Sequence, residues 1–176
     1  EEYCLCNMNK LLNVEDILEH PEFRKSVEIA TLINGEGGAG SHMHTHLLFL
    51  LRLLGSKEKS IYLEIGTNEG GSLAMIGLCP LPTEMIGIDN REDSEAQAKE
   101  TLEKYGVDQK VHTVYGTSYE EVTHDKTSRI LNGRKVDILL IDGEHSRNAV
   151  NKDFWTYWDL VAKGGIIVFD DAQVEE

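Results

Sequence analysis

Short apolar strands alternate with helices from residue 61 onward, and this alternation limits the possible folds more than any other feature. The pattern predicts strands at residues 61–65, 85–88, 111–114, 136–141 and 166–169. These segments are rich in apolar and β-branched residues, which is typical of strands buried on both faces. Strands that alternate with helices form right-handed βαβ units. The sequence therefore predicts an α/β fold with a doubly wound, mainly parallel sheet and helices on both faces.

Helices are expected between these strands, at residues 70–78, 94–105, 119–131 and 147–162. Apolar side chains recur at helical spacing along the last of them, so we expect this helix to lay one face on the sheet. This apolar stripe consists of Val150, Phe154, Trp158 and Val161.

The first third of the chain lacks this alternation and is predicted to be helical. Pro21 interrupts or restarts a helix, and Ser41 can cap a second helix that runs to Leu54. We therefore divide the chain into a helical segment at residues 1–58 that covers the ligand site and an α/β unit at residues 59–176.

Three histidines fall in the second of these N-terminal helices. His42 and His46 are four residues apart and could share one helix face, as zinc ligands do, but no third ligand stands at a matching spacing. His44 could touch a cofactor or substrate, although a solvated or packed histidine is the more common case. The role of the three histidines stays open.

The chain of 176 residues carries a formal charge of −14, which limits its partners. Acidic surfaces repel phosphate backbones, so we expect no nucleic-acid partner. No run approaches the ~18–20 apolar residues of a membrane span, so we expect no membrane partner. An odd number of cysteines (Cys4, Cys6 and Cys79) fits a reducing compartment, and we expect a cytoplasmic location. A homo-oligomer is left open.

Ligands of a parallel α/β sheet bind at the carboxyl ends of its strands. Four of the five predicted strands end at or beside a carboxylate. The residues at these ends are Glu64, Asp89, the pair Thr117 and Ser118, Asp142, and the pair Asp170 and Asp171.

The turn after the first strand is rich in glycine and runs from Glu64 to Ser72. Glycine lets a ligand approach the backbone closely, and the following helix offers free N–H groups. A dinucleotide site would show G-x-G-x-x-G, whereas this turn has the form E-x-G-x-x-x-G with a second acid at Glu69. These acids favour a ligand that has a positive centre and no phosphate; a tight turn without a ligand is the alternative.

This set of strand ends resembles class I S-adenosylmethionine-dependent methyltransferases, which have a Rossmann-like sheet, over roughly residues 41–173. The resemblance implies that Gly66 and Gly70 make room for S-adenosylmethionine, that Ser72 binds its carboxylate and that Asp89 binds its ribose hydroxyls, with Ser118 beside the adenine. The full implied cofactor set is Glu64, Gly66, Thr67, Gly70, Ser72, Asp89, Thr117, Ser118 and Asp142.

The segments after the fourth and fifth strands resemble metal-dependent small-molecule O-methyltransferases of the catechol and antibiotic-sugar type. The resemblance implies a divalent metal, with Mg²⁺ expected, held by Asp142, Asp170 and Asp171, which would activate a substrate hydroxyl. His145 would be the general base, so that Asp142 and His145 are the expected catalytic residues. The alternatives are aspartates that cap helices or form an acidic rim, and a histidine that faces water.

The expected function is therefore methyl transfer from S-adenosylmethionine to a hydroxyl of a small molecule. Two other classes stay open: a non-catalytic cofactor-binding subunit and a nicotinamide-dependent oxidoreductase. Such methyltransferase domains usually continue past the fifth strand, whereas this sequence stops five residues after Asp171, so we expect either a truncated chain or a partner chain that supplies the rest.

Overall fold

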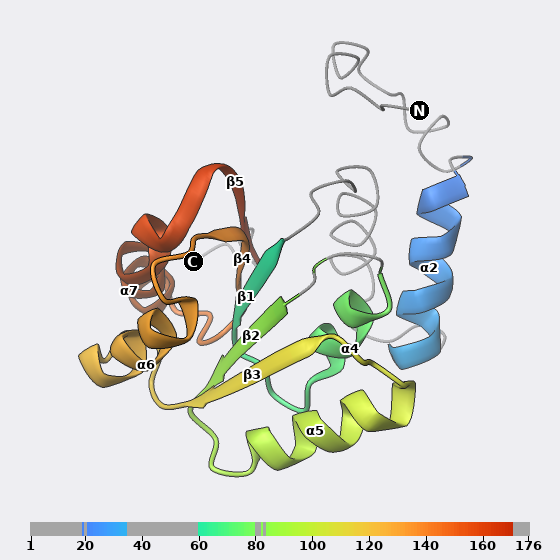
Figure 1. Cartoon of the computed structure of the whole chain (residues 1–176), viewed down its shortest axis with the longest axis horizontal. Helices are drawn as coiled ribbons and strands as arrows, with labels where there is room; N and C mark the ends of the chain where they lie inside the picture. The colour runs from blue at the N-terminus through green and yellow to red at the C-terminus, as the bar shows by residue number, and fades with distance from the viewer. Residues whose placement is uncertain (1–18, 20, 35–59, 80–81, 83, 171–176) are drawn as a thin grey trace.

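The computed structural model describes residues 19, 21–34, 60–79, 82 and 84–170. In this part of the chain, five parallel strands form one sheet in the order β3-β2-β1-β4-β5 (Figure 1). The strands are β1 (Ile61–Ile65), β2 (Glu84–Asp89), β3 (Lys110–Tyr115), β4 (Val136–Ile141) and β5 (Val161–Phe169). The strand order reverses direction between β1 and β4, which is where ligands bind in such sheets.

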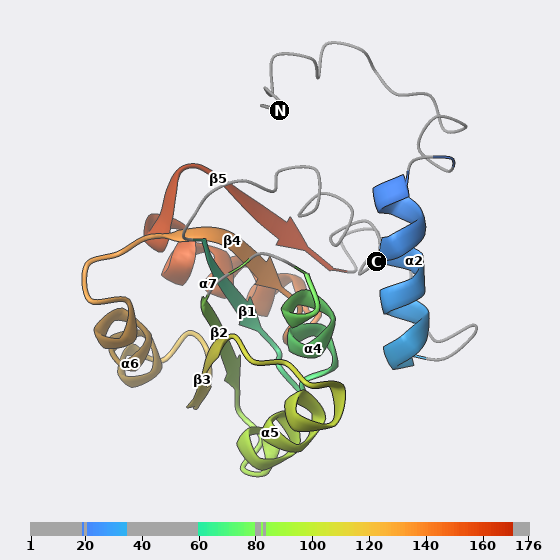
Figure 2. The ribbon, with the colours of Figure 1, turned by 45° about the vertical axis from the view of Figure 1, so that its right-hand side comes forward.

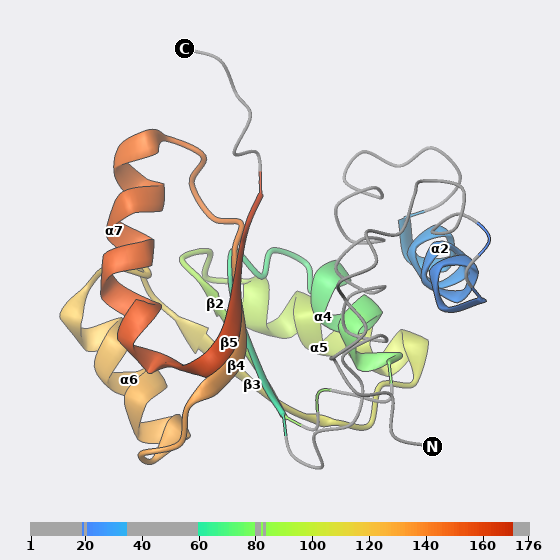
Figure 3. The same ribbon diagram turned by 90° about the horizontal axis from the view of Figure 1, so that it is seen from above.

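Helices cover both faces of the sheet, as the sequence predicted (Figure 3). Helices α4 (Gly71–Gly77) and α5 (Ser94–Tyr105) lie on one face, and α6 (Glu121–Leu131) and α7 (Arg147–Tyr157) lie on the other. Helix α2 (Pro21–Asn34) packs against α4 outside the sheet (Figure 2). None of the helices in the described ranges is long and apolar enough to cross a membrane.

Side chains of the central strands alternate between two cores, because successive strand residues point to opposite faces. Tyr62 and Leu140 belong to the core under α4 and α5, whereas Leu63 and Leu139 belong to the core under α6 and α7. Burial is nearly complete on β1, β2 and β4, but β3 and β5 are partly exposed. The expectation that every strand is buried on both faces is therefore wrong for these two strands.

The last predicted helix is too long and the last predicted strand too short. Helix α7 ends at Tyr157, a short 3₁₀ turn follows at Trp158–Leu160, and β5 begins at Val161, which is paired with Val136 of β4. The spacing of Val150, Phe154, Trp158 and Val161 suits a helix, but the hydrogen bonds available along β4 favour an extended chain from Val161 onward. Sequence periodicity contains no information on this long-range partner.

Several predicted features lie outside the described residues. These are the helix that runs to Leu54, the three histidines, Cys4, Cys6 and Asp171.

Candidate functional site

A cavity of about 470 Å³ opens at the carboxyl ends of the central strands. It lies between the turn after β1, the end of β2, the turn after β3 and the loop that joins β4 to α7. Six of the predicted site residues line it: Gly66, Asp89, Thr117, Ser118, Asp142 and His145. The sheet thus brings together residues that are up to 79 positions apart in the chain, from Gly66 to His145.

The glycines of the first turn make room for the protein's own backbone. Gly66 has φ +97°, and a Cβ at this position would stand 2.0 Å from the backbone oxygen of Asp142. Gly70 has φ +80°, and its Cβ would stand 2.7 Å from Cα of Ala98 in α5. Gly66 also lines the cavity, whereas Gly70 is not among the residues that line it. The turn is therefore closed tightly against β4 and α5.

Glu64 is fully buried behind this turn and does not line the cavity. Its two carboxylate oxygens accept hydrogen bonds from the Tyr62 hydroxyl at 2.8 Å and from Ser72 Oγ at 3.0 Å. Burial raises the pKa of Glu64 from 4.5 to about 7, although these hydrogen bonds oppose the shift. Ser72 was expected to bind the cofactor, and in the structure its hydroxyl binds the buried Glu64 carboxylate. Thr67 is also buried, and its side chain lies against Gly87 of β2.

Glu64 makes the stability of the fold depend on pH in a defined direction. Its folded-state pKa of about 7 lies above the reference value of 4.5, so the folded protein holds this proton more tightly than the unfolded chain. This stabilisation is complete below pH 4.5 and is lost as the pH rises through 7, by about 3 kcal/mol in total. We expect Glu64→Gln to flatten this dependence in urea unfolding curves measured from pH 5 to pH 8; an unchanged slope would contradict the assignment.

Asp89 at the end of β2 is held by backbone donors. Its Oδ2 accepts from the N–H of Asn68 at 2.7 Å, and its Oδ1 accepts from the N–H of Arg91 at 2.8 Å. The side chain of Arg91 lies 3.6 Å from the same Oδ1. The carboxylate thus has a fixed orientation at the cavity wall and retains lone pairs for further donors, such as the two hydroxyls of a diol.

Ser118 is tied to a residue that the sequence analysis did not single out. Its Oγ donates a hydrogen bond to Oδ1 of Asp153, and its backbone oxygen accepts from the Tyr157 hydroxyl at 2.8 Å. Asp153 is 1% exposed and lines the cavity from α7. The signal that could have identified it is an aspartate beside Phe154 on a helix that was expected to lie on the sheet.

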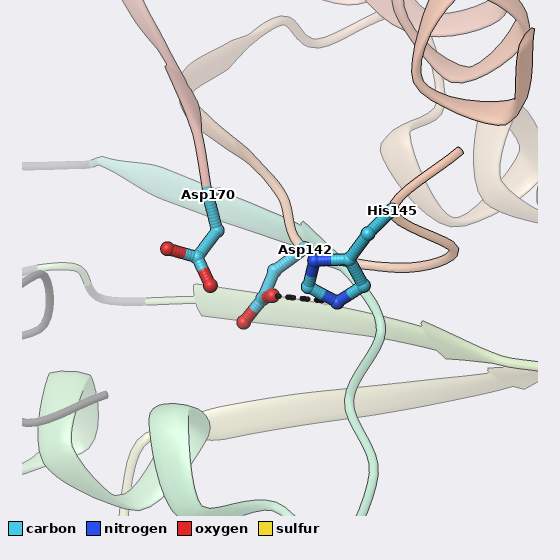
Figure 4. A group of neighbouring side chains, drawn as sticks. All are labelled: Asp142, His145 and Asp170. Atoms are coloured by element: carbon cyan, nitrogen blue, oxygen red, sulfur yellow. Dashed lines mark ion pairs between the residues drawn. The ribbon is translucent and has the colours of Figure 1, made fainter. Parts of the chain in front are cut away.

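Asp142, His145 and Asp170 lie together at the ends of β4 and β5 (Figure 4). Each offers one ligand atom, and these atoms are all within 4.8 Å of one another. His145 Nε2 lies 3.9 Å from Asp142 Oδ1 (Figure 4). Two carboxylates and one imidazole within this distance fit a divalent metal. His145 was not among the aspartates predicted as metal ligands, and the structure adds it to Asp142 and Asp170.

The cavity has an acidic lining. Asp89, Asp142, Glu144 and Asp153 contribute carboxylates, and Arg91 is the one arginine or lysine among the described residues that line it. Phosphate groups are disfavoured in such a site, whereas a cationic ligand or a metal ion is favoured.

The sequence of this chain matches a known protein family. Residues 63–172 match the family described as a methyltransferase domain. An uncharacterized protein of Acanthamoeba polyphaga mimivirus is 37% identical in an alignment of 139 residues that covers 77% of this chain. The chain spans 62% of the length of that viral relative.

Solved structures share the fold at low sequence identity. An O-methyltransferase from Bacillus cereus in complex with SAH superposes with a TM-score of 0.59 at 18% identity, over 89% of this chain and 69% of that chain. An rRNA methylase from Streptococcus thermophilus superposes with a TM-score of 0.50 at 10% identity, over 88% of this chain and 75% of that chain.

Proposed function

Because this chain belongs to the methyltransferase domain family, we propose that it transfers the methyl group of S-adenosylmethionine to a hydroxyl group of a small molecule. The observation that carries this proposal is the single cavity that joins Asp89 to Asp142 and His145, with Asp170 beside them. A carboxylate that could accept hydrogen bonds from a diol thus shares one cavity with residues that could activate a hydroxyl.

The cofactor fits this cavity by charge and by hydrogen bonding. Asp89 would accept from the ribose hydroxyls, and the turn at Thr117 and Ser118 would lie along the adenine. The sulfonium centre is positive, and the carboxylates around it favour a cation. A nicotinamide dinucleotide would instead bring its pyrophosphate into an acidic site that lacks G-x-G-x-x-G.

The cluster of Asp142, His145 and Asp170 supports transfer to oxygen. A divalent metal held by the two aspartates would lower the pKa of a substrate hydroxyl. His145 has two roles open to it: it can complete the ligand set or accept the hydroxyl proton. One nitrogen cannot bind a metal and accept a proton at the same time. The ring is about half exposed and lies beside Asp142, so either role is possible.

A small acceptor is favoured over a nucleic acid by charge. The chain carries a formal charge of −14, and the lining of the cavity is itself acidic. Nucleic-acid binding requires basic residues along the phosphate path. The fold alone does not determine the acceptor, because one fold supports many chemistries.

Titration calorimetry with S-adenosylhomocysteine tests the cofactor site. We expect micromolar binding, weakened by about 30-fold or more in Asp89→Ala, because two hydrogen bonds to a charged acceptor are lost. Asp125→Asn on the exposed face of α6 is the matched control and should bind like the unmodified protein. Asp89 also holds the turn after β1, so the melting temperature of each variant is measured in parallel.

This titration, a parallel titration with NAD and an assay of methyl transfer together decide between the function classes. Absence of binding to folded protein would remove the cofactor proposal. Binding of NAD in its place would favour the oxidoreductase. Binding of S-adenosylhomocysteine without turnover against any hydroxylated acceptor would favour the non-catalytic subunit.

A further inference from the structure

The cluster at the ends of β4 and β5 contains donor atoms of two chemical kinds. Asp142 and Asp170 offer carboxylate oxygens, whereas His145 offers an imidazole nitrogen, and the three ligand atoms are within 4.8 Å of one another. Ions bound at about 2.0–2.2 Å keep their ligand atoms roughly 3–4 Å apart, so small rotations of these side chains would bring all three onto one ion. The nitrogen distinguishes this cluster from the all-oxygen set of three aspartates that the sequence predicts.

The backbone on both sides of His145 is held in place. Its two neighbours are joined by a hydrogen bond from Ser146 Oγ to Glu144 Oε1 at 2.7 Å. Ser146 also caps α7, because its Oγ accepts a hydrogen bond from the N–H of Ala149. The segment that carries His145 is therefore tied to the start of a helix, and the imidazole lies beside the Asp142 carboxylate (Figure 4).

The two aspartates are held by neighbouring strands. The N–H of Asp142 donates to the backbone oxygen of Ile65 at 2.9 Å, and the N–H of Asp170 donates to that of Ile141 at 3.0 Å. All three ligand side chains thus project from backbone that the sheet or a helix start holds in place. This preorganisation lowers the entropy cost of assembling them around an ion.

The chemistry of the donor atoms determines which ion such a site prefers. Mg²⁺ prefers oxygen ligands, whereas an imidazole nitrogen suits transition ions such as Fe²⁺, Ni²⁺ and Zn²⁺. We propose that His145 is a metal ligand and that its nitrogen makes the site select a divalent transition ion over Mg²⁺. This inference rests on the proposed function. It departs from the Mg²⁺ that the sequence predicts, and it assigns the imidazole to the metal rather than to the proton of the substrate.

Titration calorimetry with Mg²⁺ and Co²⁺ tests this preference, because the two ions are similar in size and differ in their affinity for nitrogen. The protein is first freed of metal with a chelator, and no S-adenosyl compound is added. We expect Co²⁺ to bind at least about 30-fold more tightly than Mg²⁺. His145→Asp replaces the nitrogen by a third carboxylate, so we expect this ratio to fall by about tenfold or more.

Pulsed EPR of bound Mn²⁺ detects the ligand directly, because a coordinated imidazole nitrogen modulates the signal of the ion. We expect this nitrogen modulation in the unmodified protein and its loss in His145→Asp. His112→Gln is the matched control, because His112 of β3 contacts Glu84 and is not among the residues that line the cavity. This control should leave both the ratio of affinities and the nitrogen modulation unchanged.

Each outcome of these measurements bears on the inference. Equal affinity of the unmodified protein for the two ions, binding of neither ion, or bound Mn²⁺ without nitrogen modulation would overturn it. A His145→Asp variant that keeps the full ratio or the modulation would also overturn it. If this variant does not fold, the modulation in the unmodified protein still decides.

Failure of the proposed function would be recognised separately. The metal titrations contain no cofactor, so a protein that does not bind S-adenosylhomocysteine can still show the expected ion preference. Conversely, a protein that binds S-adenosylhomocysteine and no metal ion would retain the cofactor proposal and overturn the role of His145 as a metal ligand.

Discussion

Replacement of Asp142 by alanine is expected to lower methyl transfer by roughly 10²–10⁴-fold while S-adenosylhomocysteine affinity changes little. Asp142 is the central member of the cluster, with His145 on one side and Asp170 on the other (Figure 4). Its loss would remove a metal ligand and the partner of the imidazole together. The measurement is the rate of S-adenosylhomocysteine formation against a panel of hydroxylated acceptors, with the exposed Asp125→Asn as the control.

A chelator test shows whether the loss of activity in Asp142→Ala reflects the loss of a metal ligand. In the metal mechanism, a chelator abolishes turnover of the unmodified protein and an added divalent ion restores it. Full activity of Asp142→Ala, or activity that no chelator affects, would show that the metal mechanism is wrong.

His145→Ala then distinguishes the two roles of the histidine. A loss that excess metal rescues identifies a ligand, whereas a loss that only higher pH rescues identifies a base.

Gly66→Ala is expected to destabilise the fold by roughly 3 kcal/mol or more, which would lower Tm by about 10 °C in a chain of this size. The new methyl group would stand 2.0 Å from the backbone oxygen of Asp142, and φ at Gly66 is +97°. Relief of the clash requires the loop after β4 to move, and this loop positions Asp142 and His145. Thermal unfolding followed by circular dichroism measures the effect.

Gly133→Ala is the matched control for this substitution. Gly133 also has a positive φ of +79°, but a Cβ there would meet nothing within 4 Å. It should therefore cost only the conformational strain of alanine, about 1 kcal/mol. Equal melting temperatures for the two variants would show that contact with the β4 loop does not determine the need for glycine at Gly66.

The sequence predicted the fold class and most of the cavity because both depend on local regularities. Short strands alternating with helices imply a parallel sheet, and parallel strands place their carboxyl ends at one edge. Asp89 ends its strand, and Ser118, Asp142 and His145 lie within four residues after theirs, so their meeting in one place required no knowledge of packing.

Residues whose role depends on distant partners were assigned incompletely. Ser72 and Thr67 lie in the expected turn, but the buried Glu64 carboxylate and Gly87 determine what they contact. Asp153 was missed because its partner, Ser118, is 35 positions away in the chain. The start of β5 at Val161 was missed for the same reason, since only pairing with β4 makes that segment a strand.

The sequence by itself determined the succession of strands and helices along the chain, the polar residues at the strand ends and the acidic character of the site. Only the tertiary structure decided which glycine lies against which backbone, which acid is buried with a raised pKa, and which side chains share a hydrogen bond across elements. The physical reason is distance along the chain. Periodicity and turn chemistry act over a few residues, whereas close packing and desolvation arise where remote segments meet.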